Sequence, residues 1–222
     1  MDQARWTEVD HYLDEVVVGS DPALAAALDD VVRAGLPAIS VSPTQGKLLH
    51  ILARMVGARR ILEVGTLGGY STIWLARAVP ADGVVVTLEI DPRNAAVAGA
   101  SVRRAGLGDR VDIRVGRAAE TLAALVAEDV EPFDMVFLDA DKRSNPEYLS
   151  WALRLTRVGG VIVIDNVVRK GAVVDADTTD PDITGTRRMH EMFAQEPRLL
   201  ATAIQTVGSK GYDGFAIALV VG

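Results

Sequence analysis

The sequence lacks cysteine altogether, which excludes disulfide bonds, thiolate metal sites and cysteine nucleophiles. It also lacks an excess of basic residues, since 23 lysines and arginines stand against 30 aspartates and glutamates, for a formal charge of −7. A nucleic-acid duplex is bound through clustered basic side chains, so nucleic acid is not expected as a partner. Local basic residues could still hold a small anionic substrate.

No apolar run is long enough to cross a membrane, and the first residues lack the basic and then apolar layout of a signal peptide. We therefore expect a cytoplasmic protein without a membrane partner. The chain has 222 residues, of which 49% are hydrophobic, and this is sufficient for one α/β domain with its own core. We expect a single domain over residues 1–222, in which residues 1–40 form an N-terminal helical segment.

The most informative stretch is a short apolar strand that leads into a glycine-rich turn and then a helix, with E-V-G-T-L-G-G-Y-S from Glu63 to Ser71. Its three glycines let the backbone turn tightly and approach a ligand. Ser71 is expected to cap the helix that follows. The pattern differs from the G-x-G-x-x-G of dinucleotide enzymes because an acid stands in the strand end. It therefore favours a nucleotide ligand with a cationic part over a pyrophosphate.

A second acid, Glu89, stands at the end of the next predicted strand, 20 residues after Gly69. In nucleotide-binding α/β folds a carboxylate at this place accepts hydrogen bonds from both hydroxyls of the ribose. The alternative is an ordinary surface glutamate at a strand end. The glycine-rich turn upstream favours the ribose.

Strands and helices alternate along most of the chain with short connections. The patterns predict helices at 6–18, 22–34, 43–55, 92–104 and 186–194, and another helix that starts at Asn145 and is stopped by Gly159-Gly160. They predict strands at 111–115, 133–138 and 161–164, and a loop at 171–185. Two further strands, 199–207 and 215–221, are joined by 208–214 and form a hairpin. Such alternation implies a parallel sheet with right-handed crossovers, closed by an antiparallel edge. Ligands bind at the carboxyl ends of such strands.

Polar residues follow two of these strands directly. Asp139 comes after the strand 133–138, and Asp165 and Asn166 come after the strand 161–164. Parallel strands end at one edge of the sheet, so these side chains should meet there, beside the glycine-rich turn. Three oxygen ligands suit Mg²⁺ or a similar divalent ion. The alternative is that they only cap the loops that follow.

Three segments, E-V-G-T-L-G-G-Y-S, F-L-D-A-D-K and V-I-D-N-V, together resemble the cation-dependent class I O-methyltransferases of the catechol and caffeoyl-CoA type, over about residues 40–214. The resemblance implies S-adenosylmethionine as methyl donor and a Rossmann-like, seven-stranded, mostly parallel sheet with helices on both faces. It also implies a divalent cation, with Mg²⁺ the first choice, that holds a small phenolic substrate. Family members are often homodimers, so a second copy is a candidate partner.

The resemblance also implies a role for each matching residue. The methionine end of the cofactor would be held by Glu63, Gly65, Thr66, Ser71 and the backbone of Val41, the ribose by Glu89, and the adenine would lie against Ala118, with Asp139 and Asp141 near the cofactor. Asp139, Asp165 and Asn166 match the metal ligands. Lys142 matches the general base.

The chain departs from the plant enzymes after D-N-V, where they have an aromatic residue and Asn and this chain has Val168-Arg169-Lys170. Arg117 is a further departure, because it places a long charged side chain beside the expected adenine position. A bacterial-type member with broad phenolic specificity fits these residues best.

Three other functions remain open. A nicotinamide oxidoreductase would use Gly65 and Glu89, but it gives no reason for the oxygen ligands to converge. A non-catalytic binding protein on the same scaffold would need neither these ligands nor Lys142. The segment N-P-E-Y from Asn145 to Tyr148 is similar to the N-P-P-Y signature of amino-group methylation, but it does not follow its strand directly.

Overall fold

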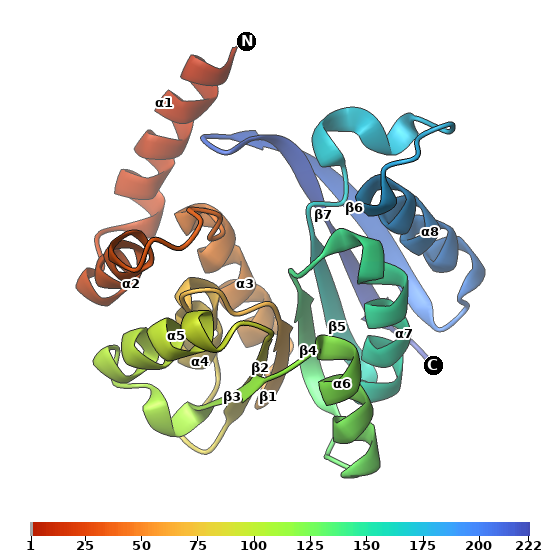
Figure 1. Ribbon diagram of the computed structural model, residues 1–222, viewed down its shortest axis with the longest axis horizontal. Helices are drawn as coiled ribbons and strands as arrows, with labels where there is room; N and C mark the ends of the chain where they lie inside the picture. Colours follow the sequence, from red (N-terminus) through yellow and green to blue (C-terminus); the bar gives the residue numbers. More distant parts are fainter. Residues whose placement is uncertain (1) are drawn as a thin grey trace.

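A computed structural model describes residues 2–222 of the chain, and a seven-stranded sheet forms its centre (Figure 1). The strands are β1 Arg60–Val64, β2 Val84–Glu89, β3 Val111–Val115, β4 Phe133–Leu138, β5 Thr156–Asp165, β6 Leu199–Gly208 and β7 Gly211–Val220. Their order is β3-β2-β1-β4-β5-β7-β6, with β1 to β5 parallel and β7 antiparallel to both of its neighbours. This confirms the predicted sheet and its antiparallel edge.

Helices cover both faces of the sheet, as predicted. They are α1 Gln3–Leu13, α2 Pro22–Arg33, α3 Pro43–Met55, α4 Tyr70–Ala78, α5 Pro92–Arg104, α6 Ala118–Ala127, α7 Asn145–Leu155 and α8 Pro181–Gln195, with short helical turns η1 Asp14–Val18, η2 Gly108–Arg110, η3 Lys142–Ser144 and η4 Arg169–Val174. One apolar core lies between the sheet and α2 to α5, and the other between the sheet and α6 to α8. Within residues 2–222 no helix is both long and apolar enough to cross a membrane.

The first helix, α1, stands away from the body and buries none of its residues (Figure 1). Its polar side chains nevertheless contact the tip of the β6–β7 hairpin. Gln3 Nε2 donates to the carbonyl of Gly208 at 2.8 Å, and Asp10 Oδ2 accepts from the backbone N–H of Ser209 at 2.6 Å. The N-terminal helix is therefore attached to the tip of this hairpin.

Local sequence explains where most elements begin. Asp21, Ser42 and Asp91 each accept a backbone N–H from the first turn of the next helix, and each is followed by proline. An acceptor side chain satisfies a free N–H, and proline at the first helical position needs no acceptor of its own. The predicted starts of α2, α3 and α5 are confirmed.

The prediction that Gly159-Gly160 stops a helix before the fifth strand is wrong. Helix α7 ends at Leu155, and both glycines lie inside β5, which begins at Thr156. The pairing of β4 with β5 shifts register between Phe133 and Met135, and Gly159 has φ +79°. Glycine inside a strand often marks such a bulge, because it takes a backbone conformation that other residues avoid.

Two further boundaries differ from the prediction. Helix α8 begins at Pro181 rather than at residue 186, because Asp180 caps it in the same Asp-Pro arrangement that starts α2. The hairpin is confirmed, but its connection is only Ser209-Lys210, since pairing continues to Gly208 opposite Gly211. The patterns above also do not predict α6, although its alanine-rich sequence favours a helix.

We predict opposite stability effects for the same substitution at two helical glycines. A Cβ at Gly46 in α3 would lie 2.4 Å from the Trp74 ring of α4. A Cβ at Gly99 in α5 would lie 3.2 Å from the flexible end of Arg103 and make an ordinary contact with Ile113 at 3.7 Å. Gly46→Ala should lower the free energy of unfolding by about 1–3 kcal/mol through overpacking. Gly99→Ala should raise it by about 0.5–1 kcal/mol. Urea denaturation of both variants measures this, and an equal effect at the two sites would contradict the packing of α3 on α4.

Candidate active site

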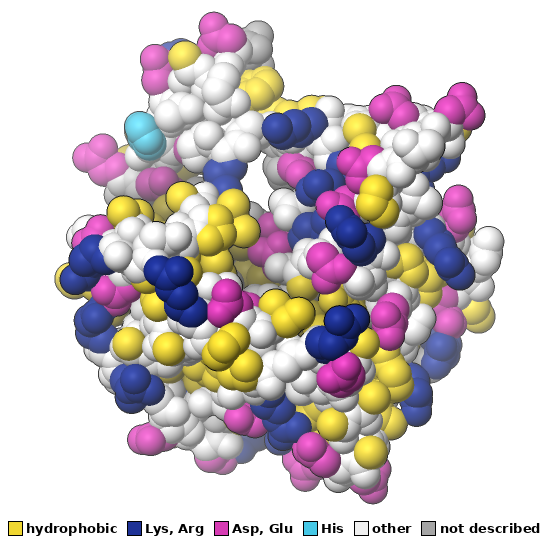
Figure 2. Space-filling model, viewed as in Figure 1, with side chains coloured by type: hydrophobic (Ala, Val, Ile, Leu, Met, Phe, Trp, Pro, Cys, Tyr) yellow, Lys and Arg dark blue, Asp and Glu magenta, His cyan; other side chains and the backbone are white. Residues whose placement is uncertain are grey.

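A cavity of about 720 Å³ opens at the carboxyl ends of the parallel strands. Its walls come from the segment Pro37–Val41, from the glycine-rich turn after β1, and from residues that follow β2, β4 and β5. Figure 2 shows the surface hollowed near the middle of the face that Figure 1 presents. This is the edge at which the sequence predicts a ligand.

The cavity brings together most of the residues predicted for the site. Its lining includes Val41, Gly65, Thr66, Ser71, Glu89, Ala118, Asp139, Asp141, Lys142 and Asn166. Glu63 and Asp165 lie behind the lining, with 0% and 7% of their surface exposed. Arg117 is exposed and pairs with Glu120 at 3.5 Å, so its charge points to water rather than to the cavity.

Glu63 has a different environment from the predicted one. Its carboxylate accepts hydrogen bonds from the hydroxyls of Ser71 at 2.6 Å, Thr72 at 2.5 Å and Thr87 at 2.7 Å. The side chain has no exposed surface and does not line the cavity, so Glu63 lies behind the wall, and its contact with a ligand stays a prediction. The predicted cap at Ser71 is also wrong: Gly69 occupies the cap position, and the Ser71 hydroxyl donates to Glu63 instead.

The buried position of Glu63 also affects its protonation. Burial raises the pKa of the Glu63 carboxyl to about 7, although the three hydroxyl groups oppose this shift. The donors come from two elements beside the turn, since Ser71 and Thr72 lie in α4 and Thr87 lies in β2. Glu63 therefore holds the strand, the helix and the neighbouring strand in one arrangement behind the cavity wall.

Gly65 is the position at which only glycine fits. It has φ +102°, and a Cβ there would lie 2.3 Å from the carbonyl oxygen of Asp139. The backbone N–H of Asp139 donates to the carbonyl of Val64 at 2.8 Å. The glycine-rich turn thus packs directly against the residue that begins the predicted metal site.

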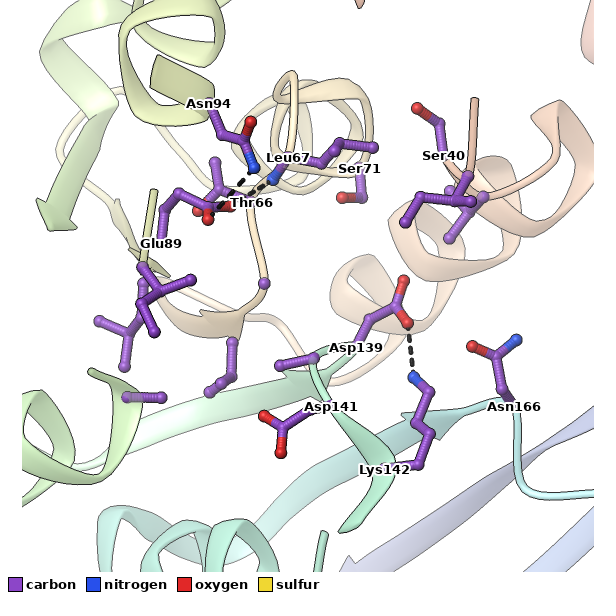
Figure 3. Close-up of a pocket in the computed structure, with 18 of the residues that line it drawn as sticks. Ser40, Thr66, Leu67, Ser71, Glu89, Asn94, Asp139, Asp141, Lys142 and Asn166 are labelled. Carbon is purple, nitrogen blue, oxygen red and sulfur yellow. Dashed lines mark hydrogen bonds and ion pairs between the residues drawn. The ribbon is translucent and has the colours of Figure 1, made fainter. Parts of the chain in front are cut away.

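Glu89 lies on the cavity wall at the end of β2 and supports the glycine-rich turn. Its Oε2 accepts from the backbone N–H of Leu67 at 2.8 Å, and its Oε1 accepts from the backbone of Asp91 at 2.9 Å and from Asn94 at 3.3 Å (Figure 3). A carboxylate has about four acceptor sites, and these three bonds leave one of them free, on Oε2. Glu89 can therefore hold a ribose, and that role stays a prediction.

The predicted metal residues converge at the ends of β4 and β5. Lys142 Nζ donates to Asp139 Oδ1 at 2.8 Å, and Asn166 faces the same part of the cavity (Figure 3). Burial and, after it, the nearby Asp139 together raise the pKa of the Asp165 carboxyl to about 6, and Lys142 opposes this shift. Two carboxylates close enough to repel one another, with an amide beside them, fit a divalent cation that prefers oxygen ligands.

Among residues 2–222 there is no cluster of three or more His, Asp or Glu side chains that could hold a metal ion. A site at the ends of β4 and β5 therefore depends on the amide of Asn166 as its third protein ligand. Asn166 has φ +57°, in the left-handed region that asparagine tolerates better than most residues. The metal-binding roles of all three residues stay predictions.

The wall opposite β5 is held by a residue that the sequence patterns miss. Lys210, at the tip of the β6–β7 hairpin, donates from Nζ to the carbonyls of Ile39 and Ser40. Those residues line the cavity next to Val41. Arg169 also lines it and is likewise absent from the predicted site. A lysine in a tight turn carries no sequence signal for such a contact, whereas the unusual V-R-K after D-N-V does mark Arg169.

Comparison with known proteins identifies the family to which the chain belongs. A family model described as O-methyltransferase matches residues 15–218. The catechol O-methyltransferase of Mycobacterium tuberculosis is 54% identical over 96% of this chain and 95% of its own length. The crystal structure of the O-methyltransferase from Bacillus cereus in complex with SAH is 52% identical, with a TM-score of 0.97 over 99% of this chain and 100% of that one.

A further solved structure, the O-methyltransferase TomG from Streptomyces achromogenes in complex with SAM, is 51% identical and has a TM-score of 0.97 over 100% of both chains. The matches extend over nearly the whole length of each protein. The chain belongs to the O-methyltransferase family.

We predict that Glu63 makes the stability of the unliganded protein depend on pH. Its pKa is about 7 in the folded state and near the ordinary 4.5 when unfolded, so the folded state binds the proton more tightly. Its stabilising contribution is present below about pH 4.5 and is lost as the pH rises to about 7. Glu63→Gln cannot lose a proton, so wild-type stability should fall relative to the variant by on the order of 1 kcal/mol per pH unit in this window.

Chemical denaturation of both proteins from pH 4.5 to pH 8 measures the difference. Glu120→Gln is the matched control, because 75% of the Glu120 side chain is exposed. A constant difference between wild type and Glu63→Gln across the window would show that the buried carboxyl does not take up a proton.

Proposed function

We propose that this O-methyltransferase transfers a methyl group from S-adenosylmethionine to one hydroxyl of a catechol-like phenol, and that it requires a divalent cation. The observation that carries this proposal is the shared cavity. The glycine-rich turn and Glu89 line one side of it, and Asp139, Lys142 and Asn166 line the other (Figure 3). The relatives named catechol O-methyltransferase support the phenolic substrate.

The order of the strands supports a proposed place for each part of the ligands. Glu89 is the last residue of β2, the glycine-rich turn follows β1, and Asp139 and Asn166 follow β4 and β5, in the spatial order β2-β1-β4-β5. The ribose of the cofactor would lie at Glu89 and its methionine part at Gly65, Thr66 and Ser71. The sulfur-bound methyl group would then point towards the acceptor at β4 and β5. Holding donor and acceptor in line is a large part of the catalysis expected here.

A divalent cation held by Asp139, Asp165 and Asn166 would supply the positive charge that fixes two neighbouring substrate oxygens and makes a phenol more acidic. Lys142 is the residue that would take the proton from the attacking hydroxyl. Its Nζ lies 2.8 Å from Asp139 Oδ1, so it is held beside the proposed acceptor position. As the oxygen–methyl bond forms, the sulfur–methyl bond breaks and the sulfur keeps the electron pair. Lys142 would accept this proton as the neutral amine, because an ammonium has no free electron pair, and would then pass it to water.

The alternative of a nicotinamide oxidoreductase does not agree with the family to which the chain belongs. A non-catalytic member would have no use for Lys142 beside an intact set of oxygen ligands. A homodimer and a cytoplasmic location remain predictions. Light scattering in solution and fractionation of cells would test them.

A methyl-transfer assay tests the proposed function. Purified protein is incubated with S-adenosylmethionine and a panel of catechols and single phenols, with added Mg²⁺ or with a chelator. We expect methylated catechols with the metal and almost none after chelation, because the cation is the group proposed to fix both substrate oxygens and to make the phenol more acidic. No product from any catechol would contradict the proposed function. Full turnover after exhaustive chelation would contradict its metal dependence alone.

We predict that Lys142→Met lowers kcat by about 10²–10⁴-fold, the usual contribution of a general base, and leaves cofactor affinity nearly unchanged. Arg143→Met is the matched control, because the adjacent Arg143 pairs with Asp182 at 3.0 Å and does not line the cavity. Steady-state kinetics and cofactor titration separate the two effects. Equal losses of kcat in both variants would show that only the charge of this turn matters.

A further inference from the structure

Almost every charged side chain that lines the cavity pairs with another group of the same chain. Glu89 accepts from Leu67 and Asn94, and Asp139 pairs with Lys142. Asp141 accepts from the hydroxyl of Tyr148 at 2.6 Å, and Asp182 pairs with Arg143 at 3.0 Å. These contacts leave one charged group of the lining to be explained, the guanidinium of Arg169.

Among residues 2–222 the side chain of Arg169 has no hydrogen-bond or ion-pair partner, and its Nε is buried without one. Buried N–H groups are almost always paired, since leaving one unpaired costs stability. Arg169 lies at the start of η4, three residues after Asn166, and it is the only arginine in the lining of this cavity. Its free donors therefore face the space where the substrate is proposed to bind.

The backbone that carries Arg169 is held in an unusual conformation. Arg169 and Lys170 both have φ +56°, in the left-handed region that residues with a Cβ rarely adopt. Asp213, at the start of β7, imposes this turn: its Oδ1 accepts from the N–H groups of Val168 at 3.0 Å and Arg169 at 2.8 Å. Strain that the surroundings enforce is common at functional sites. Here it directs Arg169 to the cavity.

We propose that Arg169 determines substrate specificity by pairing with an acidic group of the phenolic substrate, a carboxylate on the ring or on a short side chain. The inference rests on the proposed function of the site. A guanidinium presents a planar fork of donors that matches a carboxylate. The protein as a whole carries a charge of −7 and so repels anions, which makes a local positive group necessary for an acidic substrate.

The position of Arg169 also favours the substrate over the cofactor as the ligand that it binds. The proposed ribose and methionine positions follow β2 and β1, whereas Arg169 follows β5, beyond the proposed metal ligand Asn166. The carboxylate that it binds therefore belongs to the part of the substrate that points away from the methyl donor. The carboxylate of the cofactor's methionine part would be the other source of a negative charge, and the experiment below distinguishes them.

The test compares 3,4-dihydroxybenzoate with its neutral analogue 3,4-dihydroxybenzamide in the methyl-transfer assay. Arg169→Met should lower kcat/KM for the acid by about 10-fold or more, mainly through KM, the effect of losing charge-assisted hydrogen bonds. It should change kcat/KM for the amide less than about 2-fold on the same reasoning. Arg169→Lys should retain part of the preference for the acid.

Lys170→Met is the matched control. It removes the same charge from the next residue, which has the same φ but is exposed and does not line the cavity. It should leave the ratio of acid to amide unchanged. An equal change of that ratio in both variants, or an equal loss for acid and amide in Arg169→Met, would overturn the proposal. Weaker binding of S-adenosylhomocysteine by Arg169→Met would assign Arg169 to the cofactor instead.

A binding measurement keeps this test independent of catalysis. Calorimetric titration of 3,4-dihydroxybenzoate into protein saturated with S-adenosylhomocysteine and Mg²⁺ should give an affinity at least about 10-fold weaker for Arg169→Met than for wild type. If wild type bound the acid more tightly than Arg169→Met but methylated no catechol, the proposed function would be contradicted and the role of Arg169 in binding the acid would still be supported. Equal affinities of wild type and variant would reject that role.

Discussion

The buried carboxylate of Glu63 is the interaction on which the geometry of the cavity depends. A carboxylate without exposed surface is costly unless its hydrogen-bonding capacity is used, and here three hydroxyls from α4 and β2 use it. These bonds fix how α4 leaves the glycine-rich turn and how β1 lies beside β2. With the turn held from behind, Gly65 can pack against the backbone of Asp139, and the cofactor and acceptor sides of the cavity are joined directly.

The two sides of the cavity differ in how they are held. The glycine-rich turn and Glu89 are supported by contacts between neighbouring strands and helices of the same face. The acceptor side is enclosed by segments far apart in the chain: Lys210 of the hairpin tip contacts the wall at Ile39 and Ser40, and Asp213 holds the turn that carries Arg169. The C-terminal hairpin therefore shapes the acceptor side from two directions. Because its tip also contacts α1, the N-terminal helix is connected to the same wall.

This arrangement explains why parts of the site were predictable and others were not. Asp139, Asp165 and Asn166 stand directly after strands, and all parallel strands end at one edge, so their convergence follows from the order of elements alone. Glu89 follows from the same rule. The position of Glu63 does not follow from this rule, because a side chain near the end of a strand can point either towards the ligand or behind the cavity wall. Only the hydroxyls of Ser71, Thr72 and Thr87, brought together by packing, decide that it points behind.

The sequence by itself determined the alternation of strands and helices, the antiparallel hairpin and most of the helix starts, because these depend on apolar periodicity and on capping residues a few positions apart. It also predicted that Glu89, Asp139 and Asn166 lie at the edge of the sheet where the cavity opens. Only the tertiary structure decided that Gly159 and Gly160 lie inside a bulged strand, that Lys210 holds the wall at Ile39, and that Arg169 faces the cavity without a partner. Each of these features depends on contacts between segments far apart in the chain, or on a backbone conformation that such a contact enforces. The spacing of residues along the sequence predicts neither the contacts nor the conformation.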